Sequence, residues 1–156
     1  SYVDELSALT DEMLSLAPEL EPPDGFEARV LSRLNAPVVA VAPRHATCRM
    51  TVRPEMVNGF GVAHGGIVFS LADSAFACAC NTHGNVTVAV DNTITYPAAI
   101  HPGDVLTAVA DEEAGSNRLG YYRVVVTNQH DRVVALFKGT AYKTSRPHFP
   151  DETSHA

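Results

Sequence analysis

The sequence predicts an α+β fold in which a long central helix is wrapped by a curved antiparallel sheet and preceded by N-terminal helices. The helix is predicted because residues 67–80 are mostly apolar or small, with Asp73 as their only charge. Four strand-like runs follow, with turns too short for another helix, so the strands should be sequential and antiparallel. Because the helix is apolar on nearly every side, a curled sheet has to cover more than one of its faces.

The chain of 156 residues suits one main domain with an appendage at each end. We expect an N-terminal helical extension at 1–35, the main domain at 36–144 and a flexible tail at 145–156. Residues 1–28 hold eight acids and no Lys or Arg, whereas the rest of the chain holds ten acids and eleven bases. This nearly neutral main domain argues against nucleic acid as a partner.

The composition indicates a cytoplasmic protein without a membrane partner. The chain has no apolar run of the ~18–20 residues that span a bilayer, and it lacks the pattern of a secretory signal. Its three cysteines are odd in number and have no C-x-x-C spacing, so we expect reduced thiols in the core. The seven histidines are scattered, which predicts no metal site.

Two helices are predicted in the N-terminal extension. The first covers Val3 to Leu16, where leucines and a methionine recur at helical spacing. The second begins at Asp24, whose side chain can cap the helix, and Glu27 three residues later completes a capping box. Asn35 and Pro37 should end it.

Strands are predicted on both sides of the central helix. Each run is rich in β-branched or aromatic residues and is bounded by Gly, Pro, Asn or Asp. The predicted strands cover residues 38–41 and 47–52 before the helix, and 86–96, 105–112, 121–128 and 133–142 after it.

The start of the central helix, His64-Gly65-Gly66, is the strongest indication of chemistry in the chain. The two glycines expose backbone N–H groups at the positive end of the helix dipole, which favours an anion there. Further along, Asp73 lies within apolar residues, where a carboxylate costs free energy unless it is paired or used. The element therefore combines an anion site with an acid.

Together with flanking motifs, these residues resemble the hot-dog thioesterases, most closely the phenylacetic-acid-degradation branch. The resemblance covers residues 36–142 and is carried, in order, by Met50-Thr51-Val52-Arg53-Pro54-Glu55-Met56-Val57-Asn58-Gly59, His64-Gly65-Gly66, Leu71-Ala72-Asp73-Ser74-Ala75-Phe76, Pro102-Gly103-Asp104-Val105-Leu106-Thr107-Ala108 and Val134-Ala135-Leu136-Phe137-Lys138-Gly139. It implies hydrolysis of an acyl-CoA thioester without a cofactor, and a homodimer that often doubles into a tetramer. Residues 1–34 instead resemble a segment that follows the zinc-binding domain of some anti-sigma factors, whose metal ligands are absent here.

Thioester hydrolysis assigns expected roles to four residues. The N–H of Gly65 would polarise the thioester carbonyl, and Asp73 would either attack that carbonyl or deprotonate a water. His64 would hold the carbonyl region or the loop, unless it only caps the helix. Asn58 would orient water or substrate, unless it is only an Asn-Gly turn residue with positive φ.

The distance between the two principal groups predicts a homodimer. Asp73 lies eight residues beyond Gly65, or ~12 Å along one helix, whereas a reacting carbonyl must lie ~3 Å from both groups. Two antiparallel helices can bring Gly65 of one subunit opposite Asp73 of the other. We therefore expect composite active sites, as the family resemblance also implies.

Binding of the CoA thioester is expected to involve further residues. Gly66 and Ser74 lie beside the principal groups, and the candidates for the CoA phosphates are Arg118, Lys138 and Lys143. The resemblance implies a base after the Thr-Tyr strand, but the sequence there reads Tyr96-Pro97-Ala98-Ala99. It also implies an acid or amide from the N-terminal helix, for which Glu27 is the candidate unless it only completes the capping box.

Two other functions remain as alternatives. A hot-dog hydratase or dehydratase would pair a His with an acid, but no His-Phe-Pro run precedes the helix. A non-catalytic acyl-thioester-binding protein would have little need of Asp73. Serine-hydrolase chemistry lacks its G-x-S-x-G motif.

Overall fold

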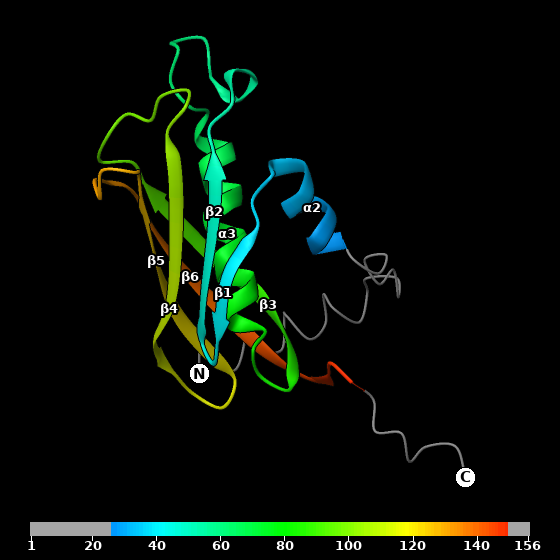
Figure 1. The fold of residues 1–156 in the computed structure, drawn as a ribbon. Coiled ribbons are helices and arrows are strands. Elements are labelled where there is room, and N and C mark those ends of the chain that lie inside the picture. The colour runs from blue at the N-terminus through cyan, green and yellow to red at the C-terminus, as the bar shows by residue number, and fades with distance from the viewer. Residues whose placement is uncertain (1–25, 150–156) are drawn as a thin grey trace.

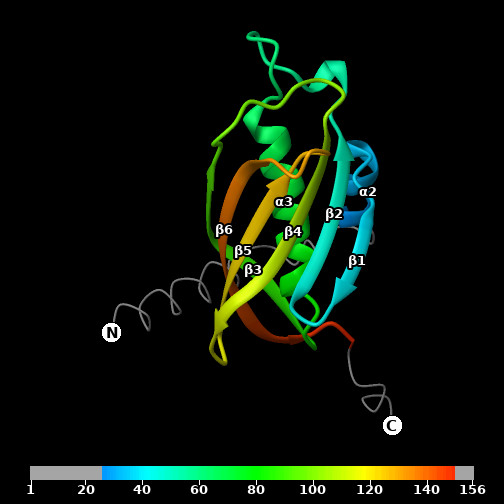
Figure 2. The same cartoon turned by 60° about the vertical axis from the view of Figure 1, so that its left-hand side comes forward.

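The central helix α3 (Gly65–Cys80) lies in the concave face of one curved sheet (Figure 1). The computed structural model describes residues 26–149 of the chain. Figure 2 shows the same helix along the inner side of the strands. The residues of α3 that are fully covered include Val68, Leu71, Ala72, Ala75, Phe76, Ala79 and Cys80. The predicted α+β architecture is confirmed.

The sheet has six antiparallel strands in the order β1-β2-β4-β5-β6-β3. The helix α2 and the short 3-10 helix η1 complete the elements. Their bounds are α2 Phe26–Leu34, β1 Val38–Ala42, β2 His45–Thr51, η1 Pro54–Met56, β3 Asn85–Thr95, β4 Val105–Gly115, β5 Leu119–Thr127 and β6 Val133–Pro147.

The expectation of sequential strands is wrong for β3. This strand lies at the edge beside β6, whereas β4 lies beside β2. The reason is that α3 carries the chain across the concave face to the far edge before β3 begins. The connection at 96–104 then returns over the start of α3, where Ala63 N–H donates to the Ile100 carbonyl (2.8 Å). A nine-residue connection is long enough to cross the sheet without containing a helix.

The strand bounds differ from the predictions mainly at the ends of the sheet. β6 continues to Pro147, and Asn85 of β3 pairs with Pro147. Residues 145–147, which we expected in the tail, are therefore strand. Of the predicted extension, α2 is present and ends at Asn35, whose φ of 51° stops the helix. The first predicted helix, Asp24 and the side chain of Glu27 lie outside the described residues.

The core lies between α3 and the inner face of the sheet, and its aromatic part is where α3 meets β5 and β6. The Phe76 ring packs against Phe137 and Tyr122, with ring centroids 5.7 and 5.3 Å apart. Beneath it lies Gly139, where an added Cβ would stand 2.8 Å from the Phe76 ring. The glycine therefore lets the middle of α3 approach β6 closely.

The loop before α3 is attached to α2. Arg53 donates to the Leu34 carbonyl (3.1 Å) and to the Arg33 carbonyl (3.4 Å), which are free because α2 ends there. Its other partner is Glu55. These contacts hold the loop that begins the functional region.

Two further expectations concern thiols and membrane helices. Cys48 and Cys80 are buried and Cys78 is half-buried; none is in a disulfide. Within residues 26–149, no helix has the length and apolar character needed to cross a membrane.

Candidate active site

His64 caps the start of α3. Its Nδ1 accepts a hydrogen bond from the Gly66 N–H (3.0 Å), which assigns the proton of a neutral ring to Nε2. The Gly65 N–H has no acceptor among the described residues, because a helix leaves its first N–H groups without partners. The His64 cap therefore uses the N–H of Gly66 and leaves the N–H of Gly65 available to a ligand.

Both glycines lie close to neighbouring side chains, and neither has a positive φ. A Cβ at position 65 would lie 3.1 Å from the Tyr96 hydroxyl, and a Cβ at position 66 would lie 3.1 Å from His64 Nδ1. The Tyr96 hydroxyl donates to the Gly65 carbonyl (2.7 Å). Tyr96 thus fixes the first residue of α3, a role that sequence reasoning missed.

Asn58 belongs to the loop that leads into α3. Its N–H donates to the Val62 carbonyl (2.8 Å), and its Oδ1 accepts from the Phe60 N–H (2.9 Å). The turn role is confirmed, but the positive φ expected for Asn58 is wrong. Gly61 takes that conformation, with φ of 75°, because the chain reverses later in the loop than an Asn-Gly turn would.

Asp73 lies midway along α3 and is half-buried. Asn92 on β3 donates from Nδ2 to Asp73 Oδ1 (3.0 Å). Burial raises the pKa of the Asp73 carboxyl above its usual range, and the hydrogen bond from Asn92 opposes part of that rise. Within residues 26–149, no base forms an ion pair with Asp73. The alternative of a structural acid paired with a base therefore finds no support in this part of the chain.

One chain does not bring Gly65 and Asp73 together. Both belong to the continuous helix α3, so the rise of ~1.5 Å per residue separates them by ~12 Å. His64, Gly65, Gly66 and Asn58 gather at the start of the helix. Asp73 and Asn92 form a second group near its middle.

The remaining predicted residues have other partners or lie elsewhere. The Ser74 hydroxyl donates to the Ser70 carbonyl (2.7 Å), a common helix contact. Lys138 is exposed on β6 opposite Arg123. Arg118 lies in the turn between β4 and β5, at the opposite end of the sheet from the loop before α3 (Figure 1).

Lys143 is engaged in a polar network at that same far end. Its Nζ donates to the Ser116 carbonyl (3.1 Å) and to Glu112 (3.4 Å), whose side chain is 6% exposed. Arg44 contacts the same carboxylate at 3.0 Å. A structural role explains Lys143, and a single chain does not place the three candidate bases at the helix start.

Four aromatic side chains on α3 and its flanking loops, Phe60, Phe69, Phe76 and Tyr96, lie in different surroundings. Phe76 is fully buried, and Phe69 packs edge-on against Phe137 at 5.5 Å. Phe60 is 93% exposed, whereas Tyr96 is 43% exposed beside Gly65. Of these side chains, Tyr96 alone combines access to solvent with a contact to the start of α3.

Comparison with known proteins decides the family. The sequence model described as the thioesterase superfamily matches residues 60–135. A putative esterase of Archaeoglobus fulgidus is 38% identical over 117 residues, which cover 75% of this chain and 76% of that protein. The chain belongs to the thioesterase superfamily.

A member of this superfamily is similar in sequence and in structure. The acyl-coenzyme A thioesterase PaaI of Escherichia coli is 38% identical over 110 residues, 70% of this chain and 79% of PaaI. The solved structure of PaaI, from the phenylacetic acid degradation operon, has a TM-score of 0.74 at 35% identity, covering 76% of this chain and 86% of that one. The resemblance to the hot-dog thioesterases of the phenylacetic-acid-degradation branch is confirmed.

A second similar structure contains a ligand. A Streptococcus mutans protein, solved bound to acetyl CoA, has a TM-score of 0.69 at 26% identity, covering 72% of this chain and 91% of that chain. The superfamily match at 60–135 includes the start of α3, Asp73 and Asn92. The resemblance of residues 1–34 to an anti-sigma factor segment stays a prediction.

Proposed function

We propose that this thioesterase hydrolyses acyl-CoA thioesters, with an aromatic acyl group of the phenylacetyl type, to the free acid and CoA. The observation that carries this proposal is Asp73, a half-buried acid on the same helix as the Gly65 N–H, which has no acceptor in the described part of the chain. The name of PaaI supports the reaction, and the acetyl CoA bound to the Streptococcus mutans protein supports the thiol portion of the substrate. Because CoA thioesters are the substrate, the reaction needs no cofactor.

The chemistry divides between the two groups of residues. The Gly65 N–H donates to the thioester oxygen and stabilises the negative charge that develops when the carbonyl is attacked. Asp73 supplies the attacking carboxylate or removes a proton from the attacking water. Collapse of the tetrahedral intermediate breaks the C–S bond, and the thiolate takes a proton from Asp73 or from solvent and leaves as CoA. If water attacks, the free acid forms in this step. If Asp73 attacks, water must then hydrolyse the acyl–Asp73 anhydride to release the acid and restore the carboxylate.

Since one chain separates these groups by ~12 Å, the proposed site contains Gly65 of one subunit and Asp73 of its partner. A two-fold axis gives each homodimer two such sites, and two dimers would form the tetramer. His64 and Asn58 act from the same side as Gly65, because all three lie in one loop and helix start. Gly66 supports them by donating to His64.

Other residues complete the proposed binding site. Ser74 contributes through its hydroxyl oxygen, since its proton is donated to Ser70. Arg118 and Lys138 are exposed bases that can reach CoA phosphates in the assembled oligomer. Tyr96 offers a ring beside Gly65, which supports an aromatic acyl group through aromatic packing.

The first test measures thiol release from a panel of aryl- and alkyl-CoA thioesters. We expect turnover by the wild type that is highest for phenylacetyl-type groups, and a fall in kcat of at least about a hundredfold in Asp73→Asn. Asp111→Asn is the matched control, because that exposed acid on β4 lies away from α3. If the wild type releases no thiol, or if Asp73→Asn is as fast, the proposal is wrong. Tight acyl-CoA binding without turnover would favour the non-catalytic alternative.

A further inference from the structure

The two polar atoms of the Asn92 side chain have different surroundings. Its Nδ2 donates to Asp73 Oδ1 (3.0 Å), but its own Oδ1 is buried and has no hydrogen-bond partner within residues 26–149. A buried amide oxygen without a partner destabilises a fold, whereas an apolar side chain at the same place would not. The benefit of an asparagine at this position therefore lies in its contact with Asp73.

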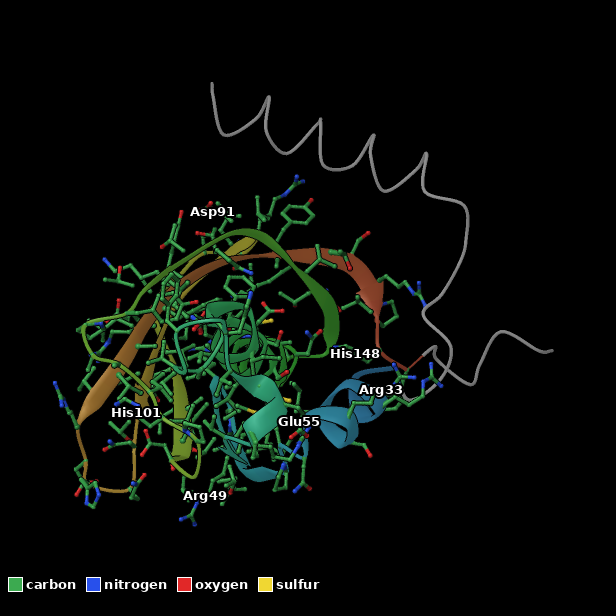
Figure 3. The ribbon with its side chains drawn as sticks, turned by 90° about the horizontal axis from the view of Figure 1, so that it is seen from above. Arg33, Arg49, Glu55, Asp91, His101 and His148 are labelled. Carbon is green, nitrogen blue, oxygen red and sulfur yellow. The ribbon has the colours of Figure 1, made fainter. Side chains whose placement is uncertain are left out.

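The position of Asn92 explains how it reaches the helix. It pairs across the strands with Gly139, the residue that lies beneath the Phe76 ring. Two residues along β3, Ile94 packs against the same core. Asp91, the neighbour of Asn92, is exposed, and in Figure 3 it lies on the outer side of the curved sheet. The strand thus presents an amide, and not its adjacent acid, to Asp73.

We propose that Asn92 is a positioning residue of the thioesterase reaction, which holds Asp73 through Oδ1 and leaves Oδ2 as the reacting oxygen. This inference rests on the proposed function. A carboxylate that is held on one oxygen presents the other in one direction, which a carboxylate free to rotate would not do. Because Nδ2 donates its hydrogen bond best to the charged carboxylate, Asn92 also favours the ionised form that can accept a proton.

The surroundings of Asp73 add no competing charge. Burial and Asn92 account for the direction of its pKa shift. In the described residues, the other titratable side chains on α3 or against it are the thiols of Cys48, Cys78 and Cys80, the phenols of Tyr122 and Tyr96, and the His64 ring at the helix start. Burial raises the pKa of Cys80 to about 12, and it raises the pKa of Tyr122 well above the usual range, so both are neutral at pH 7. The pKa of Cys48 is raised by its hydrogen bond with Cys78 and by burial.

The test replaces Asn92 with Leu, which has a similar size but no donor, and compares two readouts. In thiol release, we expect kcat to fall about tenfold to a hundredfold, the usual worth of a hydrogen bond to a charged group. The acid limb of the kcat/KM profile should move to higher pH by about one unit or more, because Asp73 loses the donor that favours its ionised form. Asn92→Asp, which also removes the donor but adds an acid, should move the limb further, since the two acids then titrate as a pair.

The second readout is a ¹³C NMR titration of the Asp73 carboxyl, assigned with Asp73→Asn. The midpoint should rise in Asn92→Leu and stay unchanged in Thr93→Val, a matched control because Thr93 is the exposed neighbour on β3. An unchanged midpoint in Asn92→Leu would overturn the proposal. So would a fall in kcat with an unshifted profile, or loss of the dimer in Asn92→Leu alone, since these indicate a merely structural role. If the wild type shows no turnover, the proposed function fails, and the titration still reports whether Asn92 holds Asp73.

Discussion

At the scale of single residues, small side chains and one amide set the geometry of the candidate site. Gly65 leaves room for the Tyr96 hydroxyl, and Gly66 leaves room for the His64 ring that caps it. Asp73 has an amide as its partner rather than a base. An ion pair would lower the pKa of the acid, whereas burial beside an amide leaves that pKa raised.

The raised pKa of Asp73 predicts how its removal affects stability at different pH. Because the folded state has the higher pKa, the contribution of Asp73 is fully present below the unfolded pKa and is lost as pH rises through the folded pKa. We therefore compare the change in the free energy of unfolding that Asp73→Asn causes at two pH values. This change should be more favourable to the fold at pH 7–8 than at pH 3. The half-exposed carboxylate is partly screened, so the difference should reach at most about 1 kcal/mol.

Urea denaturation of the wild type and Asp73→Asn at both pH values measures this difference. Asp91→Asn serves as the control, because Asp91 is an exposed acid next to Asn92. The prediction would be contradicted if the stability of Asp73→Asn, measured against the wild type at the same pH, were lower at pH 7–8 than at pH 3.

At the scale of elements, sequence reasoning found the helix and the strands but not the order of the strands. The runs of β-branched residues were sufficient to place β4 and β5, because alternation is local. The pairing of β3 with β6 depends on where α3 delivers the chain, which no local pattern states. Pairing between distant strands is a property of the assembled sheet.

Local sequence patterns do not give the pairing of distant strands, and for this reason Asn92 could not be predicted. The start of α3 and Asp73 could be, because they belong to one continuous pattern. Counting alternate residues from buried Thr87 places Asp91 on the inner face and Asn92 on the outer face. A register shift between Ala89 and Asp91 reverses this assignment. Tyr96 was missed for a similar reason, because its contact with Gly65 joins residues 31 positions apart.

The close approach of α3 to β6 predicts a large effect of adding one methyl group. In Gly139→Ala, the Cβ would lie 2.8 to 3.0 Å from three atoms of the buried Phe76 ring. The core has to shift, so the free energy of unfolding should fall by about 1–3 kcal/mol. Thermal and urea unfolding would measure this loss.

The control for this prediction is Gly84→Ala, where an added Cβ meets no atom within 4 Å. Combining Gly139→Ala with Phe76→Leu should cost less than the sum of the two separate losses, because the smaller side chain makes room. Strict additivity would show that the destabilisation comes from somewhere other than the Phe76 contact.

At the scale of the whole molecule, the separation of Gly65 and Asp73 along α3 makes the site a property of two subunits. We expect Asp73→Asn and Gly65→Pro to be inactive separately, since Pro at the first helical position removes the N–H. After subunit exchange, mixed dimers should recover about a quarter to a half of wild-type activity per dimer, because one site of each is intact.

Thiol release by differently tagged and purified mixed dimers measures the recovery. Gly65→Ala is the matched control for Gly65→Pro, because it retains the N–H but places a Cβ 3.1 Å from Tyr96. If mixed dimers with folded subunits show no recovery, the proposal of a site shared between Gly65 and the partner's Asp73 is wrong. Circular dichroism of each parent variant establishes that its subunits are folded.

The place of β3 at the sheet edge also has a consequence for the order of folding. Among the described strands, β3 is hydrogen-bonded to β6 alone, and Asn92 pairs with Gly139. During synthesis, α3 and Asp73 therefore emerge well before the strand that secures their amide partner. Pairing of residues so far apart in the sequence is slow. Asp73 is therefore synthesised early, and its hydrogen bond with Asn92 is held in place only after β3 pairs with β6. A nascent chain that ends before β6 carries Asp73 without the contact that orients it.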